Sequence, residues 1–145
     1  MVRLLVLDQS CLLPWVVRHE APVGVEVEAV LSLDAAERIL EQRPPDAAVV
    51  SVPPGNLPWR SFQRLCASRR PPVPVLYESC VHSDPRDAGL DPNDGYVDFL
   101  PKPAPRADLR AALLRLLIAA RRPDLSAKEG LELVILSRGR ESSQP

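Results

Sequence analysis

The chain has 145 residues, of which 46% are hydrophobic and 26% are charged, with a net charge of −1. This length and composition predict one globular domain with its own core, and the small net charge gives no field that would attract nucleic acid or a membrane surface. Residues 1–7 are largely apolar but are followed at once by Asp8, and Pro14 interrupts residues 11–17. We therefore expect no signal peptide, no membrane span and a cytoplasmic location.

The cysteines Cys11, Cys66 and Cys80 are odd in number and show no C-x-x-C spacing. This pattern favours reduced thiols that pack in the interior over a disulfide framework. Cys80 and His82 lie two residues apart, but the chain has only one other histidine. A metal site needs more ligands than this, so we expect neither a metal nor another cofactor.

The first predicted strand covers residues 2–7, a nearly continuous apolar run of the kind found in strands that are covered on both faces. Residues 10–20 follow as a predicted helix, because apolar residues recur at helical spacing and Ser10 is a suitable N-cap.

An edge strand is predicted over residues 25–29, where valine or alanine alternates with glutamate. This alternation is typical of a strand with one side in water. A second helix is predicted over residues 35–43, capped by Ser32 or Asp34.

The segment 45–55 is predicted to form the central strand. Residues 47–50 are small or β-branched and apolar, without alternation, as expected for a strand buried on both faces. Pro53 and Pro54 have no N–H for strand pairing, so the strand should end near Ser51. In open α/β sheets, ligands bind and chemistry takes place at this carboxyl edge.

A third helix is predicted from Asn56, a plausible N-cap, to about residue 69, with Trp59 at its margin. Prolines end it before a fourth strand over residues 73–77.

Residues 81–94 carry two prolines, a glycine and four aspartates but no apolar stripe. We interpret this segment as a loop in the place of a helix. A short fifth strand over residues 96–100 and an amphipathic helix over residues 108–121 complete the pattern.

Five strands that alternate with helices through short connections predict an α/β fold, a flavodoxin-like doubly wound parallel sheet of order 2-1-3-4-5 in which helix four is degraded to a loop. We assign residues 1–122 to this domain and residues 123–145 to a C-terminal tail or linker.

Roughly residues 2–117 resemble the CheY-like receiver domains of bacterial response regulators. The stretch Gly95-Tyr-Val-Asp-Phe-Leu-Pro-Lys-Pro103 is the most specific part of this resemblance, because the glycine, the apolar strand and the Lys-Pro pair agree in order and spacing. The central strand, with Pro-Asp before it and Pro-Gly after it, also resembles the third strand of that family.

In that family, two acidic residues follow strand one, a phosphoacceptor aspartate follows strand three, a hydroxyl residue follows strand four and a Lys-Pro pair follows strand five. The matching positions in this sequence are Asp8, Gln9, Ser51, Ser79 and Lys102. Phe99 falls where the family has its switch aromatic, and the resemblance implies a cis bond between Lys102 and Pro103.

Two of the three carboxylates that would hold Mg²⁺ in such a site are replaced here, by Gln9 and Ser51. A serine hydroxyl with no evident base beside it is a weak nucleophile. The resemblance therefore implies an atypical receiver without enzymatic activity. It would act in signal transduction by binding another protein, independently of aspartyl phosphorylation, and would not bind nucleic acid directly.

Three alternatives stay open at this point. The chain could be the regulatory receiver domain of a longer transcription factor, or a phospho-switch that uses Ser51 or another residue. A flavodoxin-like enzyme or nucleotide binder is disfavoured, because residues 9–11 are not glycine-rich and no G-x-S-x-G motif is present.

The loss of helix four would uncover the leucine-rich last helix, and exposed apolar patches usually mark interfaces. The candidate contacts for a partner or a homodimer, unless they are buried in the core, are Leu113, Leu116 and Leu117. The positions matched to the receiver site could equally have simpler structural roles. Ser51 would then be a plain strand-end residue, Ser79 a turn cap, Lys102 a salt-bridge partner of Asp8, and Phe99 a core residue.

Overall fold

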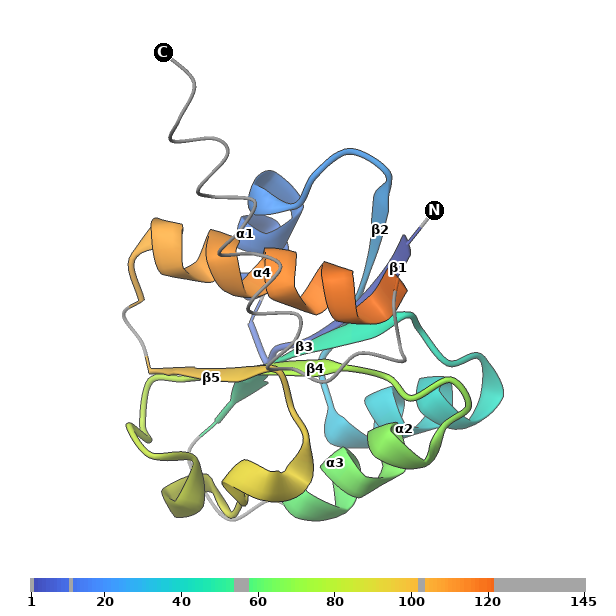
Figure 1. The fold of residues 1–145 in the computed structure, drawn as a ribbon, viewed down its shortest axis with the longest axis vertical. Coiled ribbons are helices and arrows are strands. Elements are labelled where there is room, and N and C mark those ends of the chain that lie inside the picture. Colours follow the sequence, from blue (N-terminus) through green and yellow to red (C-terminus); the bar gives the residue numbers. More distant parts are fainter. Residues whose placement is uncertain (1, 11, 54–57, 102–103, 122–145) are drawn as a thin grey trace.

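The computed structural model describes residues 2–10, 12–53, 58–101 and 104–121 of the chain. Its centre is one five-stranded parallel sheet of order β2-β1-β3-β4-β5, which confirms the predicted topology (Figure 1). The strands are β1 Val2–Leu7, β2 Val25–Val30, β3 Ala47–Val52, β4 Val75–Ser79 and β5 Asp98–Pro101.

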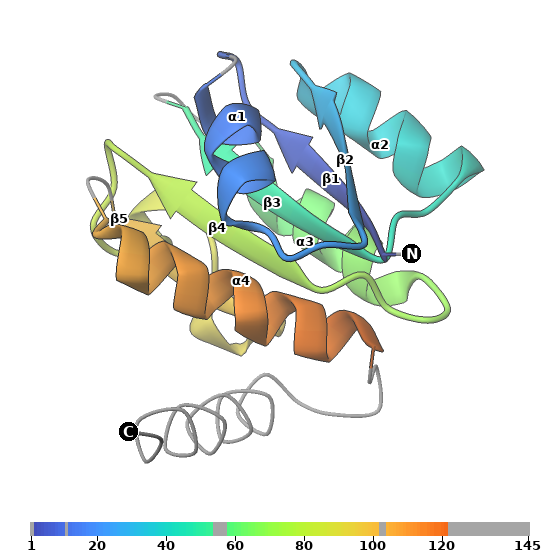
Figure 2. The ribbon, with the colours of Figure 1, turned by 90° about the horizontal axis from the view of Figure 1, so that it is seen from above.

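Helices cover both faces of this sheet. α1 and α4 lie on one face and α2 and α3 on the other, as Figure 2 shows. The helices are α1 Leu12–Glu20, α2 Leu33–Gln42, α3 Trp59–Ser68 and α4 Arg106–Arg121. Among the described residues, no helix is long and apolar enough to cross a membrane.

The core is divided into two apolar clusters by the sheet, and β3 contributes to both. Ala48 and Val50 pack on the side of α2 and α3, whereas Ala47 and Val49 pack on the side of α1 and α4. Because successive residues of a strand point to opposite faces, a strand between two helical layers must be apolar throughout. This is the physical reason for the unbroken apolar run in the sequence.

The segment between β4 and β5 contains no α-helix, as predicted, but it is not an irregular loop. It forms two short 3₁₀ helices, η1 Pro85–Ala88 and η2 Pro92–Asp94. Each begins at an aspartate whose side chain accepts a backbone hydrogen bond, and each ends at a glycine with positive φ, Gly89 or Gly95. Aspartate caps, prolines and left-handed glycines, which in the sequence indicated turns, thus build two single-turn helices.

Two predictions about the third helix need correction. α3 begins at Trp59, with Pro58 at its N-cap and no side-chain cap, while the predicted cap Asn56 lies outside the described residues. Trp59 is not marginal. It is fully buried and packs edge-to-face against Phe62 and Tyr77.

The predicted interface on the last helix is also wrong in its residues. Leu113, Leu116 and Leu117 are all buried, and Leu113 and Leu116 belong to the apolar cluster between α4 and the sheet. An amphipathic helix on a sheet buries its apolar stripe against that sheet, so the missing helix four does not uncover it. Cys80 likewise departs from the expectation of packed thiols, since it is exposed, whereas Cys66 is buried and Cys11 lies outside the described residues.

Candidate functional site

The carboxyl edge of the sheet brings three polar residues into one row. Leu7 of β1 pairs with Val50 of β3, so the next positions, Asp8 and Ser51, are neighbours. Ser51 in turn pairs directly with Glu78 of β4. Since alternate residues of a strand share a face, Ser51 and Glu78 lie on the side of the sheet that α1 and α4 cover.

Asp8 is buried, with 7% of its surface exposed, and its carboxylate organises the start of α1. One oxygen accepts a hydrogen bond from the backbone N–H of Ser10 at 3.1 Å. The other accepts from the Ser10 hydroxyl at 3.1 Å and from the backbone N–H of Leu13 at 2.9 Å. A negative charge at a helix N-terminus also interacts favourably with the helix dipole. Both carboxylate oxygens of Asp8 therefore already accept hydrogen bonds from the protein.

The predicted N-cap Ser10 shares this task. Its hydroxyl accepts a hydrogen bond of 3.3 Å from the backbone N–H of Leu12, while it donates to Asp8. Gln9, which follows Asp8 directly, has an exposed side chain. Gln9 thus presents a neutral amide to solvent.

Glu78 is a site residue that the sequence-based prediction missed. It is 7% exposed and lies next to Ser51. It also lines a cavity of about 300 Å³ between α1 and α4. The signal that could have revealed it was a carboxylate directly after the apolar residues 75–77, in a strand that must be covered on both faces.

Ser79 caps a turn, one of the two roles left open by the sequence. It is buried, and its hydroxyl oxygen accepts hydrogen bonds from the backbone N–H groups of Val81, at 3.2 Å, and His82, at 3.0 Å. Phe99, the candidate switch aromatic, is half-buried and packs against the core cluster on the side of α2 and α3.

Lys102 and Pro103 lie outside the described residues. The expected cis bond between them and the salt bridge from Lys102 to Asp8 therefore remain predictions. Among the residues that the structure describes, no group of three or more histidine, cysteine, aspartate or glutamate side chains is arranged to hold a metal ion.

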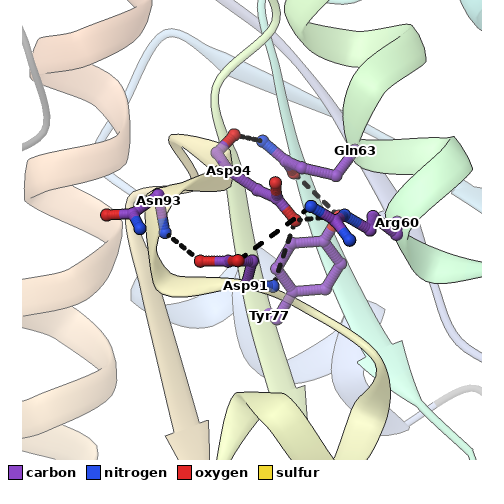
Figure 3. Close-up of polar contacts among 6 residues, drawn as sticks. All are labelled: Arg60, Gln63, Tyr77, Asp91, Asn93 and Asp94. Atoms are coloured by element: carbon purple, nitrogen blue, oxygen red, sulfur yellow. Dashed lines mark hydrogen bonds and ion pairs between the residues drawn. The ribbon is translucent and has the colours of Figure 1, made fainter.

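A second polar cluster joins α3 to the segment that replaces helix four (Figure 3). The Tyr77 hydroxyl donates a hydrogen bond of 2.8 Å to Oε1 of Gln63, and both side chains are buried. Nε2 of Gln63 donates to the backbone oxygen of Asp94 at 3.0 Å. Arg60 lies 3.6 Å from the Asp94 carboxylate and 4.0 Å from that of Asp91. These contacts hold η2 against α3.

Burial raises the pKa of two tyrosines, Tyr77 in this cluster and Tyr96 near it. It raises the pKa of Tyr77 well above its ordinary value, so the phenol stays neutral and acts as a donor. Burial also raises the pKa of Tyr96, and the nearby carboxylates of Asp94 and Asp84 contribute in the same direction. An open cavity of about 600 Å³ adjoins the cluster and is lined by Arg60, Arg86, Gly89, Leu90, Asp91 and Asn93. Its two arginines and one aspartate leave one positive charge in excess, and Arg60 lies 4.0 Å from the Asp91 carboxylate.

No protein-family model matches the sequence, and no curated protein matches it either. Solved structures of receiver domains do match the structure. A signal receiver domain from Vibrio parahaemolyticus is 18% identical, with a TM-score of 0.68 over 85% of this chain and 95% of that one. The chemotaxis response regulator CheY4 of Vibrio cholerae is 20% identical, with a TM-score of 0.64 over 80% of this chain and 98% of that one.

An orphan response regulator of H. pylori is 21% identical, with a TM-score of 0.61 over 77% of this chain and 92% of that one. The three structures are thus 18 to 21% identical to this chain, and the match covers 92 to 98% of each of them. Likeness at this level of identity establishes the fold. The chain has the five-stranded parallel α/β fold of response-regulator receiver domains.

Proposed function

We propose that this domain is a receiver-fold signalling module that acts by binding another protein and does not use aspartyl phosphorylation. One observation carries the proposal. The residue at the carboxyl end of β3, in the place where the resembling family has its phosphoacceptor aspartate, is Ser51. The five-stranded sheet that positions this residue is present, whereas the position itself carries no carboxylate.

The surroundings of Ser51 support the same proposal. Phosphoryl transfer to a receiver needs a carboxylate nucleophile and a hard divalent cation that neutralises the phosphoryl oxygens. Asp8, the acid matched to the family's cation site, has both oxygens hydrogen-bonded to Ser10 and Leu13. The neighbouring position supplies the neutral amide of Gln9. Mg²⁺ binds preferentially to carboxylate and water oxygens, so neither position favours it.

The test is intact-mass measurement after incubation with acetyl phosphate and Mg²⁺. We expect no gain of phosphate by the wild type. The matched variant is Gln9→Asp combined with Ser51→Asp, which restores both carboxylates on the same scaffold and should gain one phosphate. Stoichiometric phosphorylation of the wild type would overturn the proposal, and peptide mapping would then identify the acceptor.

A further inference from the structure

The outward face of α1 carries two large apolar side chains. Leu12 is 67% exposed and Trp15 is 51% exposed. Residues three apart are neighbours on a helix surface, so the two form one continuous patch. The Trp15 ring packs on its own helix against His19, with ring centroids 4.1 Å apart, and Nδ1 of His19 lies 2.8 Å from the backbone oxygen of Trp15. The indole is thus held in place and still presents one side to solvent.

A cavity lies directly beside this patch. It measures about 300 Å³ and is formed between α1 and α4, which run over the same face of the sheet (Figure 2). Its walls are apolar, apart from the carboxylate of Glu78 and the guanidinium of Arg106. The lining residues are Leu12, Leu13, Val16, Glu78, Ala104, Arg106 and Leu109.

The same face therefore has a protruding indole and, next to it, a cavity that suits an indole. An indole has a broad apolar body and a single N–H donor. A carboxylate has about four acceptor positions, so Glu78 can accept this N–H in addition to its existing interactions. We propose that two copies of this chain associate through the α1–α4 face, with Trp15 of each copy in the cavity of the other.

Two-fold symmetry makes this arrangement self-consistent. In an isologous dimer, residue i of one copy contacts residue j of the other and the reverse contact also forms, so a projecting residue and its cavity on one face close the assembly. The charges at the edge of the cavity are compatible with this dimer. Glu20 pairs with Arg110 at 2.9 Å and lies 3.9 Å from Arg106, so the arginines are partly neutralised within each copy.

The proposed contact is small. The large exposed apolar side chains that α1 contributes to it are Leu12 and Trp15, and small interfaces are typical of weak, transient contacts. We therefore expect a dimer that dissociates at micromolar concentration. Trp is the residue type in which binding energy most often concentrates, so Trp15 should dominate the affinity.

Sedimentation equilibrium over about 5 to about 500 μM measures this association. We expect the wild type to change from monomer to dimer over this range and Trp15→Ala to weaken association at least tenfold. Leu31→Ala is the matched control, because Leu31 is 64% exposed at the end of β2, and it should leave association unchanged. A wild type that stays monomeric, or a dimer that Trp15→Ala does not weaken, would overturn the proposal.

A second pair of variants tests the geometry through recovery of association, and not only through loss of association. Ala104→Phe fills the cavity and keeps Trp15, whereas Trp15→Ala keeps the cavity. Each variant should be monomeric by itself, and their mixture should regain one of the two contacts and associate measurably. A mixture that associates no better than either variant would contradict the exchange of indoles. These masses are independent of the phosphate measurement, so this proposal and the proposed function can fail separately.

Discussion

The carboxylate of Asp8 accepts a hydrogen bond of 2.9 Å from the backbone N–H of Leu13, the second residue of α1. Strand β1 ends just before Asp8, so this bond ties the carboxyl edge of the sheet to the first turn of the helix. The first N–H groups of a helix have no partner within the helix, and a carboxylate is among the best acceptors for them. Asp8 therefore has a structural role at the start of α1.

Removal of the Asp8 carboxylate should therefore destabilise the domain. We expect Asp8→Ala to lower the free energy of unfolding by about 2 kcal/mol, because three hydrogen bonds to a buried group are lost. Ser32→Ala is the matched control. Ser32 caps α2 through a single hydrogen bond from Ala35, and its loss should cost about 1 kcal/mol. Urea unfolding measures both, and an Asp8→Ala variant as stable as the wild type would contradict the capping role.

Binding of Mg²⁺ should be weak for the same reason. A cation at Asp8 would have to replace hydrogen bonds that hold α1, and the neighbouring Gln9 contributes no charge. We expect titration followed by NMR chemical shifts to show no saturation at physiological Mg²⁺. The variant with Gln9→Asp and Ser51→Asp should bind more tightly. Saturation of the wild type with the affinity of this variant would show that Asp8 is available to the cation.

The buried pair of Tyr77 and Gln63 should be more important for stability than the exposed ion pairs beside it. Tyr77→Phe leaves a buried amide oxygen without its donor, which costs about 1–3 kcal/mol. Arg60→Ala removes contacts of 3.6 and 4.0 Å at a half-exposed side chain and should cost less than about 1 kcal/mol. Chemical unfolding ranks the two, and the reverse order would refute the assignment.

A double-mutant cycle isolates the hydrogen bond itself. If Tyr77 and Gln63 act as a pair, the Tyr77→Phe and Gln63→Leu changes together should cost less than their sum, by about 0.5–3 kcal/mol. Strict additivity would mean that the two side chains contribute independently.

Stability should fall at alkaline pH because of Cys66. Burial raises the pKa of its thiol from 9.0 to about 12. Between these values the unfolded chain has lost the proton and the folded chain still binds it, so raising the pH favours unfolding by up to about 1.4 kcal/mol per pH unit. The stabilisation is fully present below pH 9. The raised pKa of Tyr77 acts in the same direction at higher pH.

Urea unfolding at pH 7.5, 9 and 10.5 provides the check, and Cys66→Ala should show a shallower decline than the wild type above about pH 9. Only the slopes are compared, since the alanine variant also leaves a cavity. Equal slopes would show that ionisation of Cys66 does not contribute. Alkylation with iodoacetamide adds a second readout, in which exposed Cys80 reacts in the native protein and buried Cys66 does not.

The architecture was predictable because it depends on local and generic patterns. The unbroken apolar run at residues 47–50 indicates burial on both faces, and the alternation at residues 25–29 indicates an edge. Strand boundaries were less accurate. The fourth strand begins at Val75 and not at Val73, because Pro74 has no N–H to donate to the neighbouring strand, although its oxygen accepts from Ala48 at 3.0 Å.

The roles of individual site residues were not predictable in the same way. Only the register of the sheet places Glu78 beside Ser51, because these residues are far apart in the chain and nothing near either of them specifies the pairing. The burial of Trp59 and the bond from Tyr77 to Gln63 also depend on how α3 packs on β4.

The sequence by itself determined the order and type of the main elements, the position of Ser51 at a carboxyl edge and the absence of an α-helix between β4 and β5. These follow from side-chain periodicity and from the backbone limits of proline and glycine, which act over a few residues. Only the tertiary structure decided that Asp8 caps α1, that Leu113, Leu116 and Leu117 of α4 are buried and that Leu12 and Trp15 of α1 are exposed. Each of these depends on which surfaces meet when the helices pack on the sheet, and a one-dimensional pattern does not contain that information.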